Sequence, residues 1–153
     1  MHSLFETVNK ILSAGRVGVP VFVRCAVQIA PGVDNIDSVL TRVLTIASSW
    51  LQASPIKIYA RSSNRASQIT VNTKYTGGQT SVLSVNSASG TSSRIDLMLL
   101  GNKGAIYLDA NALAPRFDIS AEPVPVPNWL IDALEQSIRA GIPALVEEVM
   151  DVE

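Results

Sequence analysis

The sequence predicts an α+β domain, with an open, mainly antiparallel β-sheet of about five to six strands and helices packed on one face. Apolar residues recur at helical spacing in three separate segments, and short β segments alternate with turn signals between residues 56 and 109. Of the 153 residues, 47% are hydrophobic and 16% are charged, which is enough for a real core and too apolar for disorder. We therefore expect residues 1–153 to form a single domain.

The first third of the chain is predicted to form a helix, a strand and a second helix. Residues 3–14 carry apolar side chains at helical spacing and are followed by Gly15, a natural helix stop. A β-branched stretch at residues 21–29 predicts the first strand. The clearest helical period runs from residue 36 to residue 51 and predicts a helix of about four turns.

The middle of the chain changes to short β segments separated by turns. Alternating residue types predict that these strands have one apolar face and one face lined with Thr, Asn and Ser. Gly77 and Gly78 predict a tight hairpin. Residues 101–104 predict another hairpin, and not a phosphate-binding loop, because they join two strands and no helix follows. The predicted strands lie at residues 56–62, 67–76, 80–88, 93–100 and 105–109.

The last part of the chain begins with a proline-rich segment. Four prolines within residues 111–127 predict an extended strap over the surface. Residues 128–140 then show helical periodicity, with Pro127 before the helix and Gly141 at its end. Residues 142–153 fit either a last helix or an edge strand, because Pro143 is compatible with both.

Charge and rare residue types exclude several classes of function. Twelve basic residues are scattered among 13 acidic ones, so the chain lacks the basic cluster that nucleic-acid binding requires. The only histidine is His2, near a terminus, which argues against His-based nucleophile systems, His general bases and His-rich zinc sites. We expect no metal, no cofactor and no catalytic residue.

The single cysteine and the hydropathy pattern bear on location. Cys25 lies within an apolar run, where we expect it to be a small buried hydrophobe. No apolar run reaches the length of a transmembrane helix, and the first residues carry an acid where a signal peptide would be basic. These observations favour a soluble, cytoplasmic protein without a membrane partner.

Five segments resemble, in order, the C-terminal domain of the glucose-fructose oxidoreductase/inositol dehydrogenase (Gfo/Idh/MocA) superfamily. They match the family's entry turn and strand, its helix start, two glycine-containing hairpins and its closing segment. The segments are Ser13–Val21, Gly32–Asp37, Tyr75–Asn86, Ile95–Asp109 and Ser137–Pro143. The resemblance implies an open-sheet substrate and oligomerisation domain. In that family the open sheet commonly packs against its counterpart in another subunit.

The departures from the family pattern concern catalysis. The family binds NAD(P) on an N-terminal Rossmann domain, but this sequence has neither a G-x-G-x-x-G turn nor the family's E-K-P lysine motif. Where the family's helix start supplies an Asp and a His for proton transfer, this chain aligns Ala30 and Asp34; only the last Asp of the motif has a counterpart, Asp37. The sequence therefore does not support dehydrogenase activity by this chain alone.

A residual polyol or sugar pocket is one interpretation of the polar residues around the start of the second helix. Asp34, Asn35 and Asp37 would grip hydroxyl groups, and Arg24 and Arg61, on strands expected to flank the pocket, would clamp an anionic group. Helix capping and a solvated strand face explain the same residues without a ligand. An unrelated enzyme using Asp34 and Asp37 as a carboxylate pair stays open as a further hypothesis.

The polar side of the predicted sheet is a candidate oligomer contact, with an ordinary solvent-exposed face as the alternative. The residues proposed for the sheet contact are Thr70, Asn72, Lys74, Ser84 and Asn86.

Our leading hypothesis for the function is a non-catalytic, stand-alone oxidoreductase-like domain that oligomerises or binds a small ligand. The alternative function is the substrate-domain subunit of a split NAD(P)-dependent dehydrogenase, completed by a separate Rossmann-type subunit.

Overall fold

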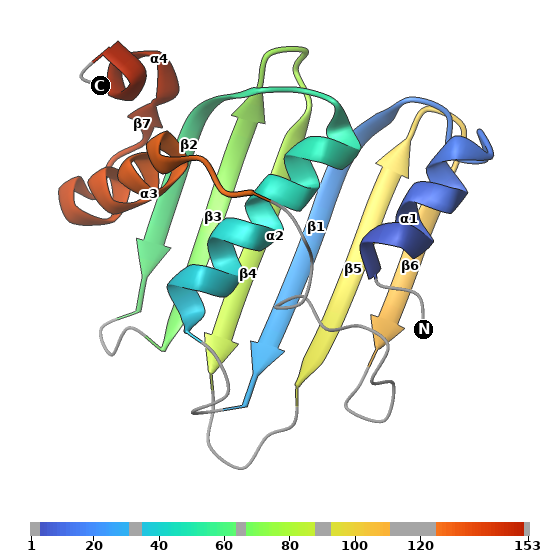
Figure 1. Cartoon of the computed structure of the whole chain (residues 1–153), viewed down its shortest axis with the longest axis horizontal. Helices are drawn as coiled ribbons and strands as arrows, with labels where there is room; N and C mark the ends of the chain where they lie inside the picture. Colours follow the sequence, from blue (N-terminus) through green and yellow to red (C-terminus); the bar gives the residue numbers. More distant parts are fainter. Residues whose placement is uncertain (1–3, 31–34, 64–66, 88–92, 111–124, 152–153) are drawn as a thin grey trace.

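A computed structural model describes residues 4–30, 35–63, 67–87, 93–110 and 125–151. The strands form one open, mostly antiparallel sheet, and the helices lie on one face of it and at its edge (Figure 1), which confirms the predicted α+β class. The elements are α1 (Leu4–Ser13), β1 (Pro20–Ile29), α2 (Ile36–Leu51), β2 (Pro55–Ser62), β3 (Gln68–Tyr75), β4 (Thr80–Ser87), β5 (Arg94–Gly101), β6 (Ala105–Ala110), α3 (Asn128–Ala140), β7 (Ala144–Leu145) and α4 (Val146–Asp151).

The described part of the sheet has seven strands, in the order β6-β5-β1-β4-β3-β2-β7. The expected five to six strands omitted β7, because a two-residue strand is too short to leave a periodic signal. The sequence of residues 142–153 is compatible with a helix or an edge strand, and the described part of this segment contains both: β7 is followed by α4. Of the predicted strap, residues 111–124 lie outside the described residues.

The pairing of β1 at the centre of the sheet sets the topology. β1 runs parallel to β4 and antiparallel to β5, and the other neighbouring pairs are antiparallel. A parallel pair requires a crossover connection, which here includes α2 and the β2–β3 hairpin. In Figure 1 α2 consequently lies across the sheet near β1 and β4, and α1 lies over the β5 and β6 side.

Alternation along the strands, interrupted in β2 after Pro55, separates a buried face from an open face. In β1 the side chains of Val23, Cys25 and Val27 are buried under the helices, whereas Arg24 and Ala26 point to the other side and are exposed. Cys25 is only 2% exposed, as expected from the sequence, and burial, together with the nearby charge of Asp96, raises its pKa to about 12. The cysteine is therefore a core residue and not a reactive thiol.

The hairpin between β5 and β6 is attached to the loop before β1. The backbone N–H groups of Asn102 and Lys103 donate to the carbonyls of Val19 and Val17 at 3.1 and 2.9 Å, and the Val19 N–H donates to Asn102 Oδ1 at 2.8 Å. A Cβ at Gly101 would collide with the Val17 carbonyl, so only glycine allows this approach. Residues 101–104 therefore form a structural hairpin, as predicted.

The β2 side of the sheet is covered by the C-terminal elements. β7 pairs with Lys57 and Ile58, and beyond that pairing the Ala60 N–H donates to Ser137 Oγ of α3 at 2.9 Å. Ser137 Oγ in turn donates to the Ile142 carbonyl at 2.8 Å, and the serine is completely buried. These contacts hold α3 against β2 and place it beside α2.

Candidate functional site

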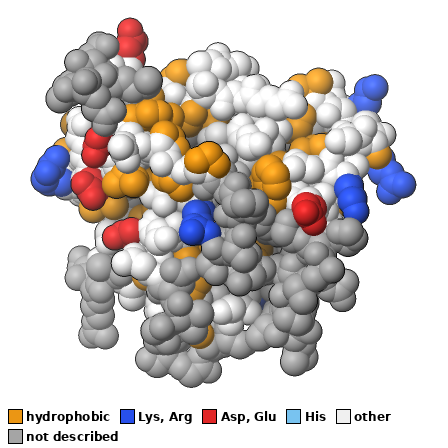
Figure 2. All heavy atoms as spheres, viewed as in Figure 1, with side chains coloured by type: hydrophobic (Ala, Val, Ile, Leu, Met, Phe, Trp, Pro, Cys, Tyr) orange, Lys and Arg blue, Asp and Glu red, His pale blue; other side chains and the backbone are white. Residues whose placement is uncertain are grey.

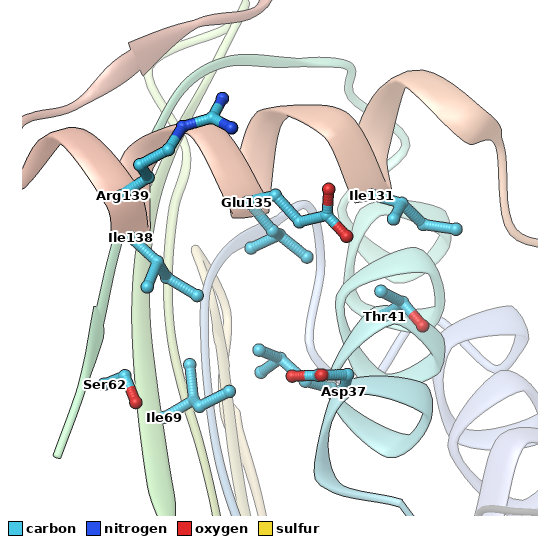
Figure 3. Close-up of a pocket in the computed structure, with 10 residues that line it drawn as sticks. Asp37, Thr41, Ser62, Ile69, Ile131, Glu135, Ile138 and Arg139 are labelled. Atoms are coloured by element: carbon cyan, nitrogen blue, oxygen red, sulfur yellow. The ribbon is translucent and has the colours of Figure 1, made fainter. Parts of the chain in front are cut away.

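A cleft with a volume of about 330 Å³ lies between the N-terminal half of α2, helix α3 and the adjoining ends of β2 and β3. Figure 3 shows Asp37 and Thr41 on α2 facing Ile131 and Glu135 on α3, across the space between the two helices. This volume is at the lower end of the range for small-molecule sites. The lining residues are Asp37, Leu40, Thr41, Ser62, Ile69, Ile131, Leu134, Glu135, Ile138 and Arg139.

Helical and strand periodicity explain why these residues meet. On α2 the lining positions are i, i+3 and i+4, and on α3 they are i, i+3, i+4, i+7 and i+8, so each set occupies one helix face. Ser62 and Ile69 are cross-strand partners in β2 and β3, on the helix-covered side of the sheet. Two amphipathic helices packed side by side on one sheet therefore form the walls and the floor.

The α2 wall of the cleft is held in place by local hydrogen bonds. Asn35 is the N-cap of α2, with its Oδ1 accepting from the Asp37 N–H at 2.8 Å. Thr41 Oγ1 donates to the Ser38 carbonyl at 3.0 Å, and Thr41 is only 9% exposed. The cap fixes the backbone from which the Asp37 side chain projects.

The charged groups of the cleft are Asp37, Glu135 and Arg139. All three side chains are solvent-exposed, and within the described ranges none of them forms an ion pair. The described lining offers carboxylate and hydroxyl groups but neither His nor Lys. Such a cleft has acceptors for ligand donors, and it lacks an imidazole or amine for proton transfer.

The structure separates the residues that the sequence had grouped into one pocket. Asp37 lines the cleft and Asn35 caps the helix beside it, while Asp34 lies outside the described residues. Arg24 and Arg61 are exposed on the opposite face of the sheet, because they occupy strand positions of the other parity from the buried residues. They therefore do not flank the cleft, contrary to the expectation from the sequence.

Sequence reasoning missed the α3 wall of the cleft. The apolar period of α3 was visible, but nothing in the sequence showed that this face would meet α2 across β2 and β3. Glu135 and Arg139 therefore looked like ordinary exposed helix residues. The spacing of Ile131, Glu135 and Ile138 on one face was the only available signal.

The open face of the sheet is the second candidate surface. Thr70 and Ser84 are directly paired, Asn72 and Lys74 occupy alternate positions of the same strand, and Asn86 pairs with Gln68. All five polar residues named from the sequence thus share this face. The sequence-based set omitted the apolar residues on this face. Those on β1, β4, β5 and β6 include Phe22, Val82, Met98, Leu100 and Tyr107.

Further described features bear on the class of protein. None of the described helices has the length and apolar character needed to cross a membrane. Within the described ranges, no group of three or more His, Cys, Asp or Glu residues is arranged to hold a metal ion. Figure 2, which views the helix-covered side, shows hydrophobic side chains gathered around α2 and α3 with acidic and basic side chains among them. The fold is thus an open-sheet α+β domain with a cleft between two helices.

Comparison with solved structures shows that this fold occurs in dehydrogenases. A probable dehydrogenase from Thermotoga maritima has a TM-score of 0.70 and 16% identity, and the match covers 95% of this chain and 62% of that chain. A scyllo-inositol dehydrogenase from Lactobacillus casei has a TM-score of 0.70 and 10% identity, covering 94% and 60%. A myo-inositol 2-dehydrogenase from Lactobacillus plantarum has a TM-score of 0.69 and 13% identity, covering 92% and 61%.

The resemblance to inositol dehydrogenase-type proteins is therefore confirmed at the level of the fold. This chain spans about three fifths of the length of the similar structures, as expected for a match to one domain of a longer protein. No protein-family model matches the sequence, and no curated protein is significantly similar to it.

Proposed function

We propose that this chain is a non-catalytic domain with an oxidoreductase-like fold, which self-associates through the open face of its sheet and offers the α2–α3 cleft to a small ligand. The observation that carries the proposal is the open face itself. The described helices lie on the other face or beside β2, so none of them covers the apolar and polar side chains that six strands place on this face.

The apolar part of the open face has the arrangement of a contact surface. Phe22 pairs directly with Leu100, and Tyr107 pairs with Met98. Tyr107 is 70% exposed, which is unusual for a large side chain with no partner surface. Burying these neighbouring side chains against a second copy would remove a continuous apolar area from water.

Charge on the open face affects how two copies would meet. Five basic side chains and two acidic ones project from it, so two identical faces repel each other at low ionic strength. We therefore expect self-association to strengthen as salt is raised from low to moderate concentration. The seven residues are Arg24, Lys57, Arg61, Lys74, Arg94, Asp96 and Asp109.

Mass measurement with a matched pair of variants tests self-association. Met98→Lys places a charge within the apolar part of the open face, whereas Gln136→Lys places the same charge on the exposed side of α3. We expect the wild type and Gln136→Lys to sediment as a multiple of 16.3 kDa and Met98→Lys to sediment as a monomer. A wild-type monomer, or a Met98→Lys variant that stays associated with an unchanged melting temperature, would contradict the proposal.

The non-catalytic part of the proposal rests on the replaced proton-transfer groups. Ala30 and Asp34 stand where the resembled family has its Asp and His, and His2 is the only histidine of the chain. NAD(P)-dependent turnover of any polyol by the purified chain would contradict it. A cytoplasmic location belongs to the same proposal, since the single cysteine is buried and forms no disulfide.

The alternative is that the chain supplies the substrate half of a dehydrogenase whose nucleotide-binding unit is a separate Rossmann-type subunit. The fold likeness to the part of the dehydrogenase structures that this chain covers, about three fifths of their length, motivates this alternative. Affinity purification from native cells followed by native mass spectrometry distinguishes the two proposed functions. A stoichiometric Rossmann-type partner supports the split enzyme, and a homo-oligomer alone supports the first proposal.

A further inference from the structure

Five of the ten described lining residues of the α2–α3 cleft are aliphatic, and the most deeply buried of the ten are among them. Leu40, Ile69 and Leu134 are at most 4% exposed and form its floor, while Ile131 is 37% exposed at its margin. A polyol filling the cleft would bring some of its hydroxyl groups against these buried aliphatic side chains, which cannot hydrogen-bond, and each unpaired group is costly. The walls thus favour a ligand with an apolar body over the polyol suggested by the family resemblance.

The polar groups on the two facing helices are mainly hydrogen-bond acceptors. Asp37 on α2 and Glu135 on α3 present carboxylates on opposite sides of the same space, as Figure 3 shows. Thr41, nine-tenths buried in the wall between them, donates its proton to Ser38, so its oxygen can act in the cleft only as an acceptor. An alkylammonium group carries three donors and a positive charge, and both properties complement this arrangement.

Arg139 is the one basic residue among the described residues of the lining. Figure 3 shows its guanidinium on the side of α3 turned away from Asp37, and in the described ranges it is not paired with Glu135 one helical turn earlier. The two carboxylates therefore face the cleft without a nearby compensating cation from the described lining. A cationic head group is accordingly favoured over a neutral or an anionic one.

From these observations we propose that the α2–α3 cleft binds a small primary amine with an apolar body, its ammonium group held between Asp37 and Glu135 and its hydrocarbon part against the aliphatic walls. This inference deepens the small-ligand part of the proposed function and does not depend on self-association. The volume of about 330 Å³ suits a compact aliphatic or aromatic amine.

A matched series of six-carbon probes tests the head group by calorimetric titration. The probes are hexylamine, 1-hexanol, hexanoate and myo-inositol, at neutral pH and fixed ionic strength. We expect hexylammonium to bind at least about tenfold more tightly than hexanol, with hexanoate weaker still and no binding of myo-inositol. Equal affinity for amine and alcohol, binding of myo-inositol in place of the amine, or no binding of any probe would overturn the inference.

Isosteric variants test the two carboxylates. Asp37→Asn and Glu135→Gln should each weaken hexylamine binding about tenfold, while Asp132→Asn, on an exposed part of α3 outside the cleft lining, should leave it unchanged. Melting temperatures verify that each variant is folded. If Asp37→Asn perturbs the start of α2, Glu135→Gln still tests the cleft, because Glu135 lies on α3 and not at the α2 cap. Unchanged affinity in both cleft variants would overturn the assignment. Sedimentation of the same samples, measured separately, reports self-association, so either proposal can fail without the other.

Discussion

On the helix-covered side of the sheet, the six long strands contribute aliphatic side chains that are almost completely buried, whereas on the open side the same strands carry a mixture of aromatic, aliphatic, amide and basic residues. Leu83 and Ser84 illustrate the contrast, since they are neighbours in β4 and point to opposite sides. The buried side is determined by packing against α1, α2 and α3. The open side is under no such constraint in the described chain, which makes its apolar residues informative about partners.

The sharpest test of this contrast truncates neighbouring residues of β4. Leu83 is completely buried, so Leu83→Ala should lower the free energy of unfolding by about 2–5 kcal/mol through lost burial and a cavity. Ser84→Ala, on the open face, should change it by less than about 0.5 kcal/mol. Urea titrations of the two variants measure both values. A similar loss for the two positions would contradict the assignment of the faces.

The buried thiol predicts that the stability of the fold depends on pH in the alkaline range. Burial, with a smaller contribution from Asp96, raises the pKa of Cys25 from 9.0 to about 12, so the folded state keeps the proton that the unfolded state releases above pH 9. The contribution to stability is complete below pH 9 and is lost as the pH rises towards 12, with a slope of up to about 1.4 kcal/mol per pH unit.

Urea midpoints between pH 8 and pH 11 measure this slope, with Cys25→Ala as the control. Cys25→Ala removes the titrating thiol, so its midpoints should fall less steeply over this range. Parallel pH profiles for the wild type and Cys25→Ala would show that the thiol is not protonated preferentially in the folded state.

At the edge of the sheet, Ser137 tests the attachment of α3. Ser137→Ala leaves the buried Ala60 N–H without its partner at 2.9 Å, and we expect a loss of about 1–3 kcal/mol in thermal unfolding. Hydrogen exchange at the Ala60 amide should accelerate in the same variant. Gln136→Ala, at the neighbouring exposed position, is the control, and an equal effect there would exclude this role for the Ser137 hydroxyl.

The smallest effect is expected on the open face. Arg94 and Asp109 form an ion pair at 2.9 Å, but their side chains are 53% and 62% exposed, so solvent and salt screen the attraction. Asp109→Asn should change the free energy of unfolding by about 0–1 kcal/mol, and added salt should reduce the difference further. The comparison is made at a protein concentration at which the chain is monomeric, and a loss there as large as that of Leu83→Ala would mean that this ion pair is shielded from solvent within the single chain.

The candidate site was accessible to sequence reasoning only in part. Asn35 and Asp37 stood out because caps and first-turn acids have a recognisable local chemistry, and the structure places them at or beside the cleft. Arg24 and Arg61 were grouped with them because each lies on a neighbouring strand, although side-chain parity directs both to the other face. Which face each β2 side chain points to depends on the register between β2 and β3, and that register shifts after Pro55. The sequence does not show this shift.

Local patterns in the sequence determined α1, α2, α3, the long strands and the two hairpins, because 3.6- and 2-residue periods and glycine turns act between near neighbours along the chain. The apolar run around Cys25 also predicted its burial, and the composition alone shows that the chain has no histidine besides His2. Only the tertiary structure decided the parallel pairing of β1 with β4, the two-residue strand β7 and the meeting of α2 with α3 that creates the cleft. These features join residues far apart in sequence, and such contacts depend on how whole elements pack, for which no local pattern carries a signal.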